Sequence, residues 1–83
     1  MLMRVKVPTR LRVRAEPSLE AKIRWFLENK TVVDVEAPVN GWSKLNGYWL
    51  KDYSDNDAHI RCNTSCYVYA KYLRKCREPK LYG

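Results

Sequence analysis

Histidine and cysteine are the residues of this sequence whose types and spacing could bind a metal ion. The single histidine and the three cysteines follow one another as His59, Cys62, Cys66 and Cys76. Zinc is usually held by four such ligands in a tetrahedron. Residues i and i+4 of one strand lie about 13 Å apart, so Cys62 and Cys66 could share an ion only where the chain turns between them. The alternative is that these residues have structural roles in a strand, a hairpin and a tail. We adopt this interpretation and expect neither a metal nor a cofactor.

Catalytic chemistry has little support in the pattern of residues. Nothing in the sequence places a serine, cysteine or carboxylate beside His59. The three glycines are not clustered, which argues against a glycine-rich loop that cradles phosphate. General acid–base catalysis needs titratable groups that converge in a pocket, and a small barrel leaves little room for one. We therefore expect that the protein is not an enzyme.

Basic residues stand at alternating positions near the N-terminus. In RVKVPTRLRVR, residues 4–14, every basic residue is even-numbered, and valine and leucine take odd positions. Because successive side chains of a strand point to opposite faces, this spacing predicts a ribbon with one apolar and one basic side. The chain has 16 Lys and Arg against 9 Asp and Glu, for a net charge of +7. Residues 71–83 add a second basic segment, with five basic residues and one acidic residue.

The first and last strands of a small barrel tend to be neighbours, so the two basic segments should converge into one basic face. Its predicted members are Arg4, Lys6, Arg10, Arg12, Arg14, Lys71, Arg74, Lys75 and Arg77. Such a face could meet an acidic protein surface or nucleic acid, and phosphate binding would weaken steeply with salt. The alternative is that these charges keep the domain soluble and protect an exposed strand edge.

Short strands separated by turns account for most of the chain. Asn40-Gly41 predicts a tight hairpin, and no segment keeps a helical apolar period for three turns. The strands are predicted over residues 4–14, 22–28, 31–35, 42–45 and 66–69. Five to six short antiparallel strands in one domain indicate an all-β fold, a small barrel with little helix. Trp42, Tyr72 and Leu73 are assigned to its core.

Four motifs in order resemble the bacterial SH3-like domain family. They are Leu11-Arg12-Val13-Arg14 with Pro17-Ser18, the alternating segment KIRWFLENKTVVDV at 22–35, Asn40-Gly41-Trp42-Ser43-Lys44-Leu45, and Cys66-Tyr67-Val68 with Lys71-Tyr72-Leu73. The resemblance covers roughly residues 10–73 of a single domain, 1–83. It implies an SH3-like barrel used either to bind cell-wall peptides or as an interaction module.

Three features depart from the family. Trp25 and Cys66 stand where the family usually has glycine, and Lys30 replaces a turn glycine. Twenty residues, 46–65, occupy a position where the family has a handful. We interpret them as part of a long protruding hairpin arm, 42–53 returning through 58–68. We expect its exposed side chains to contact a partner. They are Tyr48, Trp49, Tyr53 and Ile60.

We expect a cytosolic binding module, because the N-terminus lacks the apolar run of a signal peptide and no segment could span a bilayer. An odd number of cysteines also favours reduced thiols. The predicted role is to bind and regulate or inhibit a partner protein with an acidic surface, as a phage or mobile-element protein would. Nucleic-acid binding by the basic face is the first alternative, although Asp52, Asp55 and Asp57 near the tip of the arm argue against it. Binding of peptidoglycan is the second. Whether the protein is a monomer or a dimer is left open.

Overall fold

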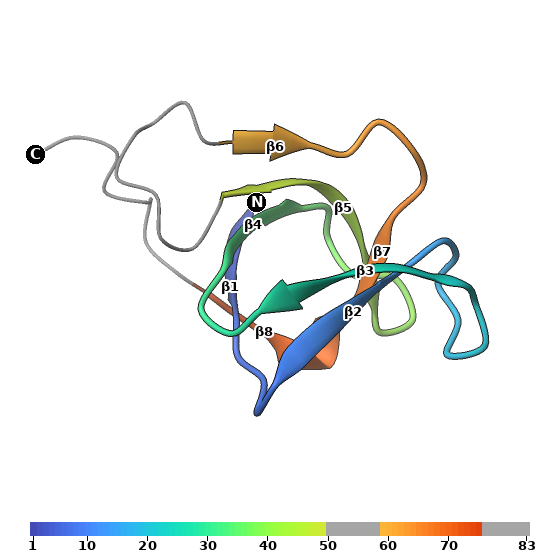
Figure 1. The fold of residues 1–83 in the computed structure, drawn as a ribbon, viewed down its shortest axis with the longest axis horizontal. Helices are drawn as coiled ribbons and strands as arrows, with labels where there is room; N and C mark the ends of the chain where they lie inside the picture. The colour runs from blue at the N-terminus through green and yellow to red at the C-terminus, as the bar shows by residue number, and fades with distance from the viewer. Residues whose placement is uncertain (50–58, 76–83) are drawn as a thin grey trace, which may run out of the picture.

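The alternating residues near the N-terminus form strands, as the sequence predicts. The computed structural model describes residues 1–49 and 59–75. Its elements are β1 (Leu2–Val5), β2 (Arg10–Arg14), β3 (Ile23–Glu28), β4 (Val32–Val35), β5 (Trp42–Trp49), β6 (His59–Arg61), β7 (Tyr67–Tyr69), the 3₁₀ turn η1 (Ala70–Tyr72) and β8 (Leu73–Lys75) (Figure 1). Every strand pairing among them is antiparallel. The prediction of an all-β fold with little helix is confirmed, but the described residues form eight short strands rather than five to six.

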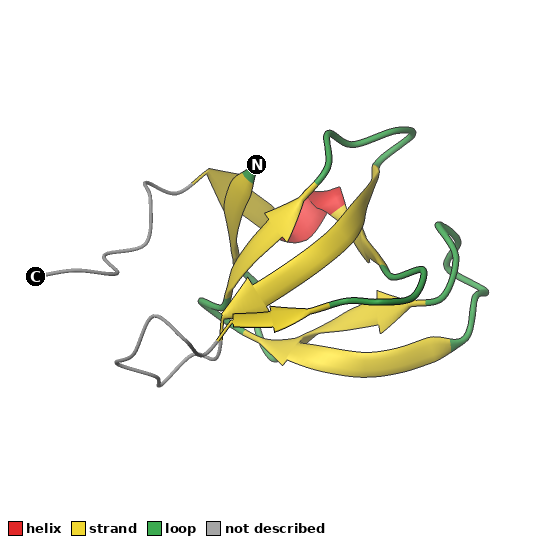
Figure 2. Ribbon diagram, turned by 90° about the horizontal axis from the view of Figure 1, so that it is seen from above, coloured by secondary structure: helices red, strands yellow, loops and turns green. Residues whose placement is uncertain are grey.

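The strands curl around one core in the order β3-β2-β7-β5-β4-β1-β8, with β6 beside β5 (Figure 2). β5 connects the two parts of the sheet, because it pairs with β7 along its first half and with β4 along its second half, where β6 pairs with it as well. The first strand, β1, pairs with the last, β8. This pairing brings the start of the chain beside its second basic segment, as expected.

Aliphatic side chains from most of the strands form the core. The apolar odd-numbered residues of the N-terminal segment point inward, and Val5, Val7, Leu11 and Val13 are all buried. β4 and β5 add Val33, Val35 and Leu45, and the C-terminal half adds Cys66, Val68 and Leu73. Each fully buried aliphatic side chain stabilises the fold by about 1.5–3 kcal/mol. The apolar side of the predicted ribbon is therefore confirmed.

The predicted ribbon is not one strand, however. β1 ends at Val5 and β2 begins at Arg10, and the two strands pair with different neighbours. Pro8 lies between them and has no N–H to donate to a strand ladder. Val7 N donates to Asn29 Oδ1 (3.0 Å), and Lys6 N donates to the carbonyl of Tyr72 (2.8 Å). The chain therefore crosses from one side of the barrel to the other while its apolar residues stay buried.

Two turns need backbone conformations in the left-handed region. Asn40 has a φ of 52° and Gly41 a φ of 86°, as a two-residue hairpin of type I′ requires. Val39 and Trp42 exchange backbone hydrogen bonds of 2.8 and 3.0 Å across them, which confirms the predicted hairpin. Lys30 has a φ of 75°, so a lysine takes a position that glycine fills without strain.

The base of the predicted arm forms a pair of strands. β5 and β6 pair with Gly47 opposite Arg61, Tyr48 opposite Ile60 and Trp49 opposite His59. The return strand, predicted as one segment over 58–68, is interrupted. It consists of β6 and β7, and residues 62–66 between them belong to neither strand. Tyr53 and the three acidic residues of the arm lie outside the described residues, as do Cys76 and Arg77. No helix in the described ranges has the length and apolar character to cross a membrane.

Candidate functional site: a basic aromatic groove

A groove of about 420 Å³ runs along β2, and we call it the basic groove. It lies between β2 and the linker before it on one side and the beginning of β5 and η1 on the other. It is lined by Val7, Pro8, Thr9, Arg10, Leu11, Arg12, Arg14, Leu19, Trp42, Tyr69 and Tyr72. Three of these residues are arginines, three are aromatic and none is acidic. The groove therefore offers positive charge and flat apolar surface together.

Three aromatic rings form one wall of the basic groove. The ring centroids of Trp42 and Tyr69 are 5.0 Å apart, and those of Tyr69 and Tyr72 are 6.0 Å apart with an edge-to-face tilt. Trp42 and Tyr69 are directly opposed in the β5–β7 pair. The backbone N–H of Ala70 donates to the carbonyl of Gly41 (2.8 Å). This bond fastens the beginning of η1 to the Asn40-Gly41 hairpin, so the wall is held by backbone structure.

The arginines of β2 line the groove at alternating positions. Arg10 and Arg12 are exposed, while Arg14 is half-buried and donates to the carbonyl of Ala21 (3.0 Å). The guanidinium carbon of Arg10 lies 4.5 Å from the ring centroid of Phe26, and Arg12 is directly opposite Phe26 in the β2–β3 pair. Among the described residues, Arg12 makes no hydrogen bond or ion pair. Its charge is therefore available to a ligand.

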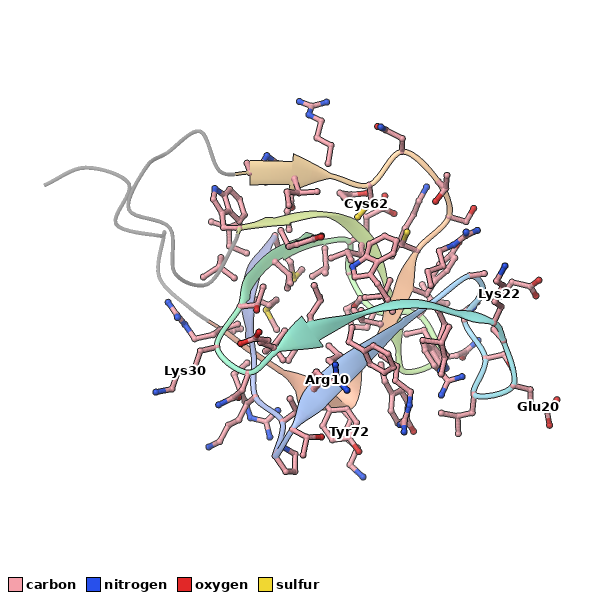
Figure 3. The ribbon with its side chains drawn as sticks, in the orientation of Figure 1. Arg10, Glu20, Lys22, Lys30, Cys62 and Tyr72 are labelled. Atoms are coloured by element: carbon pink, nitrogen blue, oxygen red, sulfur yellow. The ribbon has the colours of Figure 1, made fainter. Side chains whose placement is uncertain are left out.

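A second depression, of about 430 Å³, continues the basic surface beyond the linker. Lys6, Lys71 and Arg74 line it. It shares Val7, Pro8 and Tyr72 with the basic groove, so the two form one surface. Figure 3 shows Arg10 and Tyr72 on the same side of the barrel. The structure thus brings six of the nine predicted residues of the basic face together.

The other three predicted residues of the basic face stand apart from the groove. Arg4 lies opposite Arg74 in the β1–β8 pair, and its side chain donates to the carbonyl of Lys30 (3.1 Å). Lys75 lies opposite Met3, one position further along β8. It therefore points to the other face of the strand from Arg74. Arg77 is outside the described residues.

Acidic residues occur around the groove but not in it. Glu16 and Glu20 are exposed in the loop between β2 and β3. This loop contributes Leu19 to one end of the groove, and Figure 3 shows Glu20 on it. Glu36 lines a separate depression on the other side of Trp42. Glu28 lies directly opposite Arg10 in the β2–β3 pair. The charge beside β2 is therefore mixed near Glu28 and near Leu19, and it is most basic around Lys6, Lys71 and Arg74.

The predicted partner-binding residues of the arm are largely engaged within the domain. Tyr48 packs against the core and its ring centroid is 6.3 Å from that of Trp25. Burial, with smaller contributions from Cys62 and Cys66, raises the pKa of Tyr48. Trp49 stacks on His59 with a centroid distance of 4.3 Å. Only Ile60, with 37% of its surface exposed, is an accessible apolar residue among the described members of this set.

The candidate metal ligands are only partly brought together. Cys62 N donates to the carbonyl of Asn46 (3.0 Å) and Leu45 N donates to the carbonyl of Cys66 (2.8 Å), so the two cysteines face neighbouring residues of β5. The chain does turn between them. Burial, together with the adjacent Cys66 thiol, raises the pKa of Cys62 to about 12. In the part of the chain that the structure describes, no three His, Cys, Asp or Glu side chains converge, and Cys76 lies outside that part.

Sequence reasoning missed the aromatic wall. Leu73 is buried and Tyr72 packs against the core, as expected. Trp42 is only half-buried and lies outside the core cluster, so its assignment to the core is wrong. A signal was present in Tyr67-Val68-Tyr69, because a buried valine between two tyrosines directs both rings outward. Comparison with family models, curated proteins and solved structures finds no match.

Proposed function

We propose that the protein is a non-enzymatic module that binds an acidic segment of a partner protein in the basic groove. The observation that carries this proposal is the joining of three aromatic rings and three arginines in one open groove without an acidic lining residue. Aromatic residues and arginine are the usual energetic centres of protein interfaces. Arginine pairs with carboxylates through two parallel hydrogen bonds. Together they favour a segment that alternates apolar contact with negative charge.

The basic surface beyond the groove supports the same proposal. Lys6, Lys71 and Arg74 extend the positive potential past the end of the groove. Charge of this kind increases the rate of association with an acidic partner and orients it, more than it adds affinity. The groove would then supply the short-range contacts that the sequence had led us to expect from the arm. The scaffold is in our interpretation a bacterial SH3-like domain, and its role is regulation or inhibition of a cytosolic partner protein.

Nucleic acid is a second candidate ligand, because arginines and aromatic rings can also bind a single strand through phosphates and stacked bases. The acidic residues around the groove favour a protein instead. A nucleic-acid strand carries a phosphate at every nucleotide, so its path past Leu19 would meet Glu16 and Glu20. A peptide can place neutral residues there.

Fluorescence anisotropy with two labelled probes tests the proposal. One probe is a synthetic peptide of glutamate and valine, and the other is a single-stranded oligothymidylate. We expect the peptide to bind, and Arg12→Gln to weaken its binding by about tenfold, the value of one charge-assisted hydrogen-bonded contact. Arg61→Gln removes the same charge from an exposed position on β6, away from the groove, and should leave binding unchanged. If only the oligonucleotide bound, or if both variants lost affinity equally, the proposal would be wrong.

A further inference from the structure

We propose that the basic groove binds its peptide in a β-extended conformation, with an acidic residue at every second position in register with Arg10, Arg12 and Arg14. This inference rests on the proposed function and specifies the ligand. Its basis is the spacing of the three arginines. They occupy positions i, i+2 and i+4 of β2, and all three line the groove.

Spacing distinguishes a β-extended ligand from other extended conformations. Side chains two residues apart on a strand are separated by about 6.5–7 Å. A peptide in the same conformation repeats its side chains at the same interval, so three successive carboxylates can meet three successive guanidinium groups. A polyproline II helix presents one face every third residue, about 9.3 Å. In that conformation a carboxylate that meets Arg10 leaves the next one between Arg12 and Arg14.

The arginines at the two ends of the row are already positioned before a ligand binds. Arg10 stacks on the ring of Phe26, which is 44% exposed. Arg14 is held by its hydrogen bond to the carbonyl of Ala21. Ordering a long side chain at an interface costs conformational entropy, and part of that cost is met within the free protein. Phe26 is thus a positioning residue for Arg10.

The aromatic wall determines what lies between the acidic residues. In a β-extended peptide, alternate side chains point in opposite directions. If the acidic residues face β2, the intervening residues face Trp42, Tyr69 and Tyr72. Those rings offer apolar surface, so the intervening residues should be apolar. The ligand is therefore an alternating acidic and apolar segment of a partner protein. A second copy of this chain is a poor occupant, because each copy carries a net charge of +7.

The test uses three labelled peptides of one composition with blocked ends. Each contains the same glutamates among valine and threonine, and the glutamates stand at every second position, at every third position or in one block. All three carry the same charge, so a purely electrostatic surface would bind them alike. We expect the every-second peptide to bind about tenfold more tightly than the other two, a difference of about 1.4 kcal/mol. Phe26→Leu should reduce the difference in affinity between the every-second peptide and the other two peptides. Circular dichroism checks that this variant remains folded.

The outcomes separate this inference from the proposed function. Equal affinity for the three peptides, with the loss on Arg12→Gln retained, would overturn the register and leave the protein-binding function in place. Preference for the every-third peptide would also overturn it and would indicate a polyproline II ligand. Failure of every peptide to bind would overturn the proposed function itself. Tighter binding of oligothymidylate than of any peptide would do the same and would assign the groove to nucleic acid.

Discussion

Arg4 of β1 and Arg74 of β8 occupy directly opposed positions in the pairing of the first and last strands. The side chain of Arg4 donates a hydrogen bond to the carbonyl of Lys30. The side chain of Arg74 donates to the carbonyls of Lys71 and Leu73. Like charges placed directly opposite destabilise an antiparallel pair. Proteins commonly retain such costs where a surface has a function, so this pair fits a basic surface maintained for binding.

Replacing Arg74 should therefore stabilise the fold while weakening binding. We expect Arg74→Gln to raise the free energy of unfolding by about 0.2–1 kcal/mol, with a smaller gain at high salt because salt screens exposed charges. Urea denaturation at low and high salt measures the effect. Lys75→Gln is the matched control, since Lys75 lies opposite Met3. A gain from Lys75→Gln as large as that from Arg74→Gln would show that the opposed charges are not the cause.

One tryptophan in the basic groove and one in the arm allow a test of which surface binds the partner. Trp42 lines the basic groove, whereas Trp49 stacks on His59. We expect Trp42→Leu to lower the affinity for an acidic peptide by about thirtyfold, as loss of an energetic centre worth about 2 kcal/mol does. Trp49→Leu should leave the affinity unchanged. Anisotropy titrations measure both, and the reverse result would return the binding function to the arm.

The Asn40-Gly41 hairpin should be sensitive to a side chain at Gly41. With φ at 86°, Gly41→Ala places a side chain in the left-handed region, where an ordinary residue costs about 1–2 kcal/mol. The added Cβ would lie 3.5 Å from Tyr69 Cε1, an ordinary contact, so the cost is conformational rather than steric. Asn40→Gly is the control, because it relieves a positive φ and should not destabilise the protein. Thermal unfolding measures both variants, and equal melting temperatures would contradict this explanation.

Gly47 is needed where β6 pairs with β5. A Cβ at this position would lie 2.8 Å from the backbone oxygen of Ile60 and would also contact the imidazole of His59. A side chain can move away, but the carbonyl belongs to the β5–β6 pair. We therefore expect Gly47→Ala to separate β6 from β5 and to lower stability, while peptide binding in the basic groove is retained. Hydrogen exchange at Ile60 and Arg61 measures the separation. Unchanged protection there would mean that the arm adapts to the extra methyl group.

The half-buried thiol of Cys62 predicts a pH dependence of stability. Its pKa in the folded protein is about 12, against an ordinary value of 9.0. Between these values the unfolded chain releases the proton and the folded protein retains it, so stability should fall as the pH rises from 9 towards 12. The raised pKa of Tyr48 acts in the same direction. Urea denaturation of Cys62→Ala across this range should show a shallower decline than the natural protein, and identical slopes would exclude Cys62 as a cause.

The sequence by itself determined the all-β class and most of the aliphatic core. Alternation of apolar and basic residues is a local property, and Val5, Val7, Leu11 and Val13 are buried as that alternation requires. The Asn40-Gly41 turn is equally local, because it depends on the backbone freedom of two adjacent residues. The pairing of the first and last strands followed from the resemblance to a small barrel.

Only the tertiary structure decided which outward faces meet. Alternation shows that a side chain points outward, but not which strand lies beside it when the barrel closes. Pro8 divides the predicted ribbon, and the groove forms because β2 and β7 are adjacent and η1 is fastened to Gly41. Trp42 and Tyr69 are 27 positions apart in the sequence and become neighbours only through the β5–β7 pairing. The same closure turns Tyr48 inward against Trp25. Contacts between distant segments depend on how the strands are ordered around the barrel, and a pattern of period two contains no information about that order.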